Sequence, residues 1–478
     1  MSRVGAHRAG RSTGPFLAPP GRVLSTMNED GSRRWLEPKP SPGRFLTARR
    51  VTAYVLIALF TLIPYLRMNG KPLMLLDIPA RRFTLFGTTF FPTDTVLLLF
   101  LLLALFLGIF LVTALLGRVW CGWACPQTVY LEFVFRPLER LIEGDARRRA
   151  KRTSASRSLR RALKLAVFVL LSVYLAHTFL AYFVGTEALS HWVTESPAEH
   201  PAGFVVMLVT TGLMLLDFGL FREQSCTVVC PYGRFQSVLL DRRSLAVGYD
   251  AVRGEPRGKH PKRLPLADEK RGDGVDCGAC VVTCPTGIDI RDGLQMECVH
   301  CTQCIDACDA VMDKLKRPRG LVRYGSQDDL AGVPHKGLRW RLVLYPVLLT
   351  AALGAFVALL VLRQPAKVTV LRGLGAPFAL TQDGSVSNQI RIKVANRGAT
   401  DTSYHIELEG LPEAELIAPE NPLFVAAEHS AETSVFVVAP AALFKMGSRE
   451  VVFRVRDERG FDTRERYRLL GPAAGARR

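Results

Sequence analysis

Five stretches of hydrophobic residues alternate with polar and charged segments along the first 362 residues of the chain. Three stretches are 21 to 23 residues long without Asp, Glu, Lys or Arg, and two are 16 residues long with arginines nearby. An α-helix rises 1.5 Å per residue, so about 20 residues cross the roughly 30 Å hydrocarbon layer of a membrane. Arginines at the ends of the shorter runs can reach the membrane surface. The pattern predicts five membrane-spanning helices, at residues 51–66, 95–117, 165–185, 201–216 and 342–362.

The last 116 residues follow a different pattern, because polar and apolar residues alternate along short segments. Alternation is clear in Asn388–Val394 and Tyr404–Leu408, and short β-branched runs follow at Val435–Val438 and Val451–Val455. Glycine-containing turn sequences separate these segments. A period of two bounded by turns is typical of β-strands that bury one face. We expect an immunoglobulin-like β-sandwich without a disulfide, since this part has no cysteine; a mixed α+β domain is the alternative.

Basic residues are distributed unequally among the loops. The chain is 49% hydrophobic and carries 62 Lys and Arg against 43 Asp and Glu. There are ten basic residues in 1–50, twelve in 117–164 and twenty in 222–341. The other two loops have few: 67–93 has four and 185–200 has none. Because cytoplasmic loops carry the excess of Lys and Arg, the N-terminus and the 222–341 segment are expected in the cytoplasm and the C-terminal domain outside it. The same distribution argues against nucleic-acid binding as the reason for the net charge of +19.

These patterns divide the chain into five parts. The first, rich in Arg, Pro and Gly, is expected to be a disordered basic tail, and no hydrophobic stretch of the signal-peptide type precedes residue 51. The others are a four-span membrane core, a cytoplasmic segment with its cysteines within 268–315, a fifth transmembrane helix and the β domain. The boundaries are 1–44, 45–236, 237–341, 342–362 and 363–478.

Seven cysteines of the cytoplasmic segment have the spacing of iron–sulfur ligands. The bacterial ferredoxin run C-x2-C-x2-C-x3-C is complete at Cys298, Cys301, Cys304 and Cys308, and an incomplete run precedes it. In two-cluster ferredoxins the fourth cysteine of each run ligates the other cluster. One complete 4Fe-4S cluster is therefore assigned to Cys298, Cys301, Cys304 and Cys284, and a second cluster to Cys277, Cys280 and Cys308. Zinc is the alternative, although zinc sites use four ligands in two pairs.

The second cluster lacks one cysteine. The spacing requires a ligand three residues before Cys277, where the chain has Gly274. Three outcomes are open: a three-iron cluster (3Fe-4S), a 4Fe-4S cluster with water, Asp273 or Asp276 on its fourth iron, or a labile site. We expect one robust 4Fe-4S cluster and one altered or oxygen-sensitive cluster.

Two further cysteine pairs repeat one pattern at the ends of the second and fourth predicted spans. Each pair is a Cys-x3-Cys-Pro sequence, at Cys121 and Cys125 and at Cys226 and Cys230. In one helical turn this spacing would place both sulfurs on one face. Thiolates select Cu(I), zinc or iron–sulfur clusters, so the four cysteines are a candidate copper site. Neighbouring arginines, Arg118 and Arg234, are expected to favour the thiolate form. The alternative is that all four are buried and inert.

His177, within the third span, is a candidate ligand or quinone contact, but a hydrogen-bonded histidine within the helix bundle explains it equally well.

Four stretches around these cysteines resemble the cytochrome c oxidase accessory protein family, also called CcoG, FixG or RdxA. They are Trp120–Tyr130, Cys226–Gln236, Cys284–Arg291 and Cys304–Met312. The resemblance extends from about Gly43 to the C-terminus and implies a multi-pass α-helical protein of the inner membrane. It also implies a cytoplasmic dicluster ferredoxin insert and a periplasmic immunoglobulin-like domain. Gly274 departs from the family pattern, which has the first ferredoxin cysteine there.

The resemblance implies a role in assembling cbb3-type oxidase, through reduction of Cu(II) to Cu(I). The implied partners are the membrane, the oxidase assembly machinery and copper-handling proteins, with an electron donor that the sequence does not identify. A cupric reductase or electron-transfer activity is therefore expected. The alternatives are a quinol-oxidising membrane ferredoxin that serves another reductase, and a non-enzymatic assembly scaffold or redox sensor.

Overall fold

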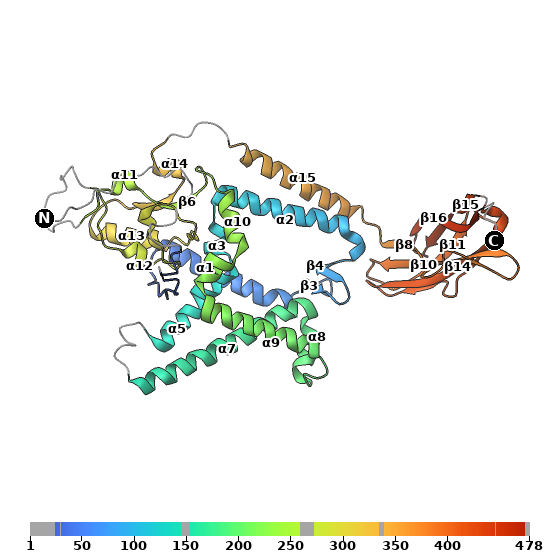
Figure 1. Ribbon diagram of the computed structural model, residues 1–478, viewed down its shortest axis with the longest axis horizontal. Coiled ribbons are helices and arrows are strands. Elements are labelled where there is room, and N and C mark those ends of the chain that lie inside the picture. The colour runs from blue at the N-terminus through green and yellow to red at the C-terminus, as the bar shows by residue number, and fades with distance from the viewer. Residues whose placement is uncertain are drawn as a thin grey trace. The chain divides into compact units, whose positions relative to one another are not determined.

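The computed structural model describes residues 24–28, 30–144, 153–258, 272–333, 339–444 and 446–473. The chain forms two compact units, one comprising Met1–Leu76 and Phe100–Leu353, the other Asp77–Leu99 and Gly354–Arg478. The first unit holds all eleven cysteines. The second holds the β domain. Figure 1 shows the elements of each unit.

Five helices of the described residues are long and apolar enough to cross a membrane, as the hydrophobic runs predict. Their side chains are mostly exposed apart from those of α7, as expected for surfaces that face lipid. In the first unit, α7 and α9 run side by side (Figure 1). The helices are α1 (Arg44–Leu62), α2 (Thr95–Leu116), α7 (Ser154–Val184), α9 (Pro201–Leu216) and α15 (Arg341–Val361).

Two of these helices begin well before the hydrophobic runs that predicted them. Helix α1 begins at Arg44 rather than residue 51, and α7 begins at Ser154 rather than residue 165. The hydroxyl of Thr153 accepts a hydrogen bond from the backbone N–H of Ser156 and caps α7. The added turns carry arginines, so hydropathy alone does not detect them.

The N-terminal segment differs from the predicted disordered tail. Three residues of this segment, Ser25, Lys39 and Ser41, form hydrogen bonds with the cysteine-rich segment. Ser25 is buried and its hydroxyl donates to the carbonyl oxygen of Thr286 at 2.7 Å. The hydroxyl of Thr283 donates to the carbonyl oxygen of Lys39, also at 2.7 Å. These contacts count against disorder of the residues that make them; the tail over 1–44 otherwise stays a prediction, and residues 1–23 lie outside the described part.

Short elements connect the spans. After α2 come α3 (Val119–Trp123), α4 (Pro126–Tyr130), the π-helix η3 (Leu131–Phe135) and α5 (Arg136–Glu143). After α9 come two further π-helices, η4 (Asp217–Phe221) and η5 (Ser225–Val229), and then α10 (Pro231–Leu239). π-Helical turns are rare and concentrate at functional sites.

The cysteine-rich segment is a small α+β fold. Strand β6 (Ala246–Tyr249) pairs antiparallel with β7 (Val322–Gly325), and between them lie α12 (Ala279–Val282) and α13 (Gln303–Lys314). Val247, Ile305 and Val322 form a buried core together with the cysteine side chains. The hydrophobic core therefore lies directly around the sulfur atoms.

The C-terminal domain is a β-sandwich, as predicted. One sheet has the order β12-β14-β10-β8 with β9 beside β10, and the other has the order β13-β11-β15-β16. Alternate residues of the central strands are buried, for example Ile390, Ile392 and Val394. The strands are β8 (Ala366–Arg372), β9 (Ala379–Leu380), β10 (Ser385–Asn396), β11 (Thr402–Glu409), β12 (Glu415–Ile417), β13 (Leu423–Val425), β14 (Ser430–Pro440), β15 (Met446–Arg456) and β16 (Asp462–Ala473).

Candidate metal-binding sites

Five cysteine side chains of the cysteine-rich segment surround one enclosed cavity. The backbone of His300 and Thr302 has positive φ angles, 53° and 62°, which curl the loop so that closely spaced thiols point inward. Apolar side chains such as Val247, Ile288 and Ile290 complete the wall. The cysteines that line the cavity are Cys280, Cys284, Cys298, Cys301 and Cys304. All except Cys280 are the cysteines that the sequence spacing assigns to the complete cluster.

A second cavity lies beside the first and contains the other group. Cys277, Cys280 and Cys308 line it, so Cys280 borders both cavities. Cys304 and Cys308, one turn apart on α13, border different cavities, in keeping with the crossed ligation of a two-cluster fold. The wall of the second cavity includes Tyr249, Arg257 and Arg291, whereas no charged residue among those described lines the first.

Gly274 lines this second cavity, but its surroundings leave no room for a side chain. A Cβ at Gly274 would lie 2.4 Å from the carbonyl oxygen of Gly254 and 2.8 Å from the Tyr249 hydroxyl. Both candidate carboxylates are held by arginines. Asp273 forms ion pairs with two arginines, Arg253 at 2.6 Å and Arg317 at 2.7 Å, and Asp276 pairs with Arg291 at 2.7 Å.

Burial keeps the cavity thiols protonated when no metal is bound. It raises the pKa of Cys280 and Cys301 to about 11 and that of Cys298 and Cys308 to about 12. Metal ions displace such protons, since a coordinated thiol is deprotonated. In the part of the chain that the structure describes, no three His, Cys, Asp or Glu side chains converge on a single ion. Cysteines spread around a cavity suit a polynuclear cluster better than one zinc ion.

The two Cys-x3-Cys-Pro segments share a geometry that differs from the single helical turn expected. Cys121 lies in α3 and Cys226 in η5, but each helix ends before the second cysteine. Cys125 and Cys230 are extended residues that precede α4 and α10, where Pro126 and Pro231 take the first helical position. Proline cannot continue a helix but starts one well, which explains the break.

The structure brings cysteines from the two segments together. Cys121 is buried against Val299 and Cys301, and Cys226 packs on the same cluster of side chains. The Cys121 thiol donates to Oε1 of Gln236, with the sulfur and oxygen 3.2 Å apart. Gln236 is fully buried, and its role beside Cys121 is not predictable from its position in the sequence.

The expectation that arginines favour the thiolate form here is wrong for the unliganded protein. Burial raises the pKa of Cys121, Cys125 and Cys226, and neighbouring thiols add to the shift at each of them. Arg118 opposes the shift at Cys121 but does not overcome it. The side chain of Arg234 lies outside the described residues.

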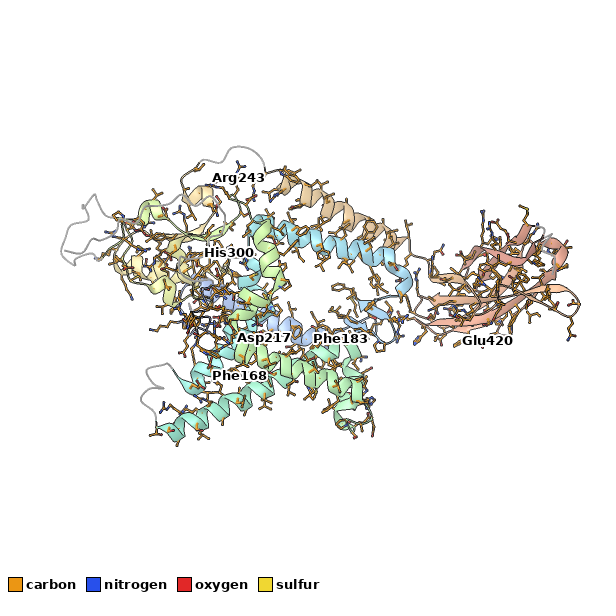
Figure 2. The ribbon with its side chains drawn as sticks, viewed as in Figure 1. Phe168, Phe183, Asp217, Arg243, His300 and Glu420 are labelled. Atoms are coloured by element: carbon orange, nitrogen blue, oxygen red, sulfur yellow. The ribbon has the colours of Figure 1, made fainter. Side chains whose placement is uncertain are left out.

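The loop that carries Cys298 and Cys301 docks directly on the first of these segments. The backbone N–H of Arg118 donates to Nδ1 of His300 at 3.1 Å (His300 is labelled in Figure 2). A Cβ at Gly122 would lie 2.5 Å from the carbonyl oxygen of Val299, so glycine is needed for this approach. Burial lowers the pKa of His300 to about 3 and keeps the ring neutral, with a smaller contribution from Arg118. The position of His300 in the sequence, between Cys298 and Cys301, does not predict its contact with Arg118.

A third cavity lies on the other side of the same loop, between α1, η3, α5 and the N-terminal segment. Arg49 and Gln303 line it, and both are buried. Nη2 of Arg49 and Nε2 of Gln303 have no hydrogen-bond partner. Arg49 is otherwise held by the carbonyl oxygen of Gly122, which accepts from its Nε at 2.9 Å. Two of the residues that line this cavity therefore each carry a buried donor without a hydrogen-bond partner.

His177 is satisfied within its own helix. Its Nδ1 donates to the carbonyl oxygen of Val173 at 2.9 Å, four residues earlier in α7. This contact fits the simpler explanation, a histidine hydrogen-bonded within the bundle.

Comparison with known proteins relates most of the chain to one group. Family models match residues 221–327 (4Fe-4S dicluster domain), 98–144 (4Fe-4S binding domain) and 356–472 (IG-like fold at C-terminal of FixG). The nitrogen fixation protein FixG of Rhizobium meliloti is 35% identical over 437 residues, covering 82% of each chain. Protein RdxA of Cereibacter sphaeroides is 36% identical over 391 residues, covering 78% of this chain and 82% of its own.

The crystal structure of a FixG-related protein from Vibrio parahaemolyticus matches with a TM-score of 0.21 and 17% identity. It covers 23% of this chain and 98% of that one.

Proposed function

The chain belongs to the FixG/RdxA-type family of membrane ferredoxins, and from this premise we propose that it delivers electrons from iron–sulfur clusters to copper during assembly of a cbb3-type oxidase. It is a membrane iron–sulfur electron-transfer protein. The cofactors supply the redox chemistry, and the protein supplies their placement and surroundings.

The proposed ligands of the complete cluster are the four cysteines that share the first cavity, Cys284, Cys298, Cys301 and Cys304. Cys277, Cys280 and Cys308 hold the second cluster. The apolar wall of the first cavity excludes water, whereas Arg257 and Arg291 bring positive charge to the second. Charge and solvent exposure are among the factors that set cluster potentials, so the two clusters differ in potential.

Copper is proposed to bind at the membrane-exit thiols, Cys121, Cys125, Cys226 and Cys230. One electron reduces Cu(II) to Cu(I), and two thiols lose their protons to water as the soft ion binds. The contact between Cys121 and the Val299–Cys301 loop carries this proposal, because it puts a thiol site against a cluster-binding loop. The two cysteine pairs need not form one site with three or more ligands, since two thiolates are enough to bind Cu(I).

The proposed location is the inner membrane. The N-terminus and the cluster segment are in the cytoplasm, and the C-terminal domain is in the periplasm. The basic loops support this orientation. The oxidase assembly machinery and copper-handling proteins are the proposed partners.

Metal analysis of anaerobically purified protein tests the copper site. Replacing all four membrane-exit cysteines by alanine should abolish Cu(I) retention and leave the iron content unchanged. The matched control replaces Cys298 and Cys301, which should remove iron. If iron instead falls in the four-cysteine variant, these thiols hold an iron–sulfur cluster, which the match of the 4Fe-4S binding model to residues 98–144 would favour.

Quinol oxidation is a second candidate function, and the third cavity is the observation that favours it. Arg49 and Gln303 line it, and each has a buried donor without a hydrogen-bond partner, the kind of group that binds a quinone oxygen. Leu46, Arg50 and Tyr54 of α1, a candidate membrane span, also line the cavity. A quinol bound there would supply the electrons, whichever acceptor follows.

Anaerobic reduction of the clusters by a short-chain quinol tests this second function. R49K combined with Q303L should abolish quinol-dependent reduction while dithionite still reduces the clusters. H177A is the matched control and should behave as wild type. Equal rates of quinol-dependent cluster reduction in wild type, the double variant and H177A would show that the cavity is not the quinol site.

A further inference from the structure

The hydroxyl of Tyr249 lies beside the position of the missing cysteine side chain. It is 2.8 Å from where the Cβ of residue 274 would be. Tyr249 ends strand β6, lines the second cavity with Cys277 and Cys308, and packs on the core that contains Cys280. An oxygen donor therefore faces the space from which the sequence has removed a sulfur.

Two glycines make room for this hydroxyl. A Cβ at Gly254 would lie 2.1 Å from the Tyr249 oxygen, and the absence of a side chain at Gly274 opens the other side. The two glycines are joined, since the N–H of Gly274 donates to the carbonyl oxygen of Gly254 at 3.1 Å. The pairing of Tyr249 with Val322 fixes the strand that carries the ring.

The hydroxyl also has a proton acceptor and a positive environment. Its oxygen donates to Oε1 of Glu255 at 3.2 Å. Arg257 and Arg291 line the same cavity. Arg257 pairs with Glu255 at 3.5 Å and Arg291 with Asp276 at 2.7 Å, so carboxylates already balance part of their charge. Asp273 is held by two other arginines and Asp276 by Arg291 itself, whereas the Tyr249 oxygen lies beside the position of the missing side chain.

We propose that the Tyr249 phenolate is the fourth ligand of the cluster held by Cys277, Cys280 and Cys308. An Fe–O bond forms as the phenol O–H bond breaks, the proton passes through Glu255 to water, and a water molecule leaves the iron. The phenolate carries one negative charge, as the thiolate of a cysteine at position 274 would. The total ligand charge therefore equals that of a four-cysteine cluster. This inference rests on the proposed cysteine ligands of the second cluster.

Resonance Raman spectroscopy of the anaerobic wild-type protein is the first test, because phenolate bound to iron gives enhanced tyrosine ring modes. These modes should be present in wild type, absent in Y249F and unchanged in Y324F. Tyr324 is a matched control on β7, next to β6, where its hydroxyl donates to the carbonyl oxygen of His300 at 3.3 Å.

Iron counting with EPR spectroscopy is the second test. Y249F should lose one iron per chain and show the signal of an oxidised three-iron cluster, while the signal of the complete cluster persists. A four-iron second cluster without phenolate modes in the wild type overturns this inference alone. If wild type contains only enough iron for one cluster, the proposed ligand role of Cys277, Cys280 and Cys308 is overturned. The tyrosine inference, which rests on that role, then falls as well. If Y249F fails to fold, the wild-type Raman and EPR spectra still show whether Tyr249 binds the cluster.

Discussion

The backbone N–H of Arg118 donates to the ring of His300 at 3.1 Å, which joins the end of the second membrane helix to the loop between Cys298 and Cys301. Both residues are buried. The contact fixes the cluster-binding loop against Cys121, because Arg118 and Cys121 belong to one short turn. Electron transfer between the two proposed sites depends on this approach.

Replacing Gly122 by alanine should separate the two sites. The added Cβ would lie 2.5 Å from the carbonyl oxygen of Val299, and backbone atoms cannot yield without moving the loop. We expect a loss of about 1–3 kcal/mol in stability, as for other overpacked positions, and slower oxidation of the reduced clusters by copper. Thermal unfolding and stopped-flow absorbance measure these effects. G108A in α2 is the control, since nothing lies within 4 Å of its added Cβ; equal behaviour of both variants would contradict the contact.

Stability should fall at acid pH through Glu139. Burial raises the pKa of this carboxyl, but Arg222 and then Lys164 outweigh burial and hold it below the ordinary value of 4.5. Because the folded pKa is the lower one, the stabilisation is complete above about pH 4.5 and is lost as the pH falls through the folded value.

The variant E139Q should therefore lose about 3 kcal/mol at neutral pH, since it leaves the buried Arg222 without its carboxylate partner, whereas Lys164 keeps Glu143 at 2.7 Å. The difference from wild type should shrink below pH 4.5, as followed by tryptophan fluorescence during denaturation. E187Q, which breaks an exposed pair with Arg67, should cost at most about 1 kcal/mol. A constant difference between E139Q and wild type at all pH values would exclude the ion pair as its cause.

Asp94 should be essential to the second unit. It is buried, forms ion pairs with Arg363 at 2.5 Å and with Arg397, and accepts from the N–H of Phe91 at 3.0 Å. D94N should leave two buried guanidinium groups without a counter-charge and cost about 3–5 kcal/mol. Limited proteolysis of the purified protein measures the loosening of this unit. Exposed Asp383 gives the control D383N, and equal protection of both variants would refute this role.

The sequence predicts the spans, the β-sandwich and the grouping of the cluster cysteines, because hydropathy, alternation and ligand spacing are local properties. It does not predict the beginning of α1, where Arg49 is buried by a contact with Gly122, 73 residues away. The N-terminal segment is ordered for a similar reason, since Ser25 and Lys39 bond to residues far along the chain. Compositional bias toward Arg, Pro and Gly does not reveal such contacts.

Details of the sites were the least predictable part. The docking of His300, the burial of Gln236 and the position of Tyr249 beside Gly274 all depend on tertiary packing. Arg118 lowers the pKa of Cys121 as expected, but desolvation of the thiol outweighs this one charge and the net shift is upward. For the second cluster, spacing alone predicted the ligands Cys277, Cys280 and Cys308 and the gap at Gly274, but not what lies beside that gap.

Anaerobic stopped-flow mixing of dithionite-reduced protein with Cu(II) tests the central claim most directly. The visible absorbance of oxidised clusters should return as one Cu(I) forms for each electron lost, with Cu(I) retained by wild type but not by the variant without Cys121, Cys125, Cys226 and Cys230. Clusters that stay reduced in the presence of Cu(II), or a preparation that contains no iron, would contradict the account.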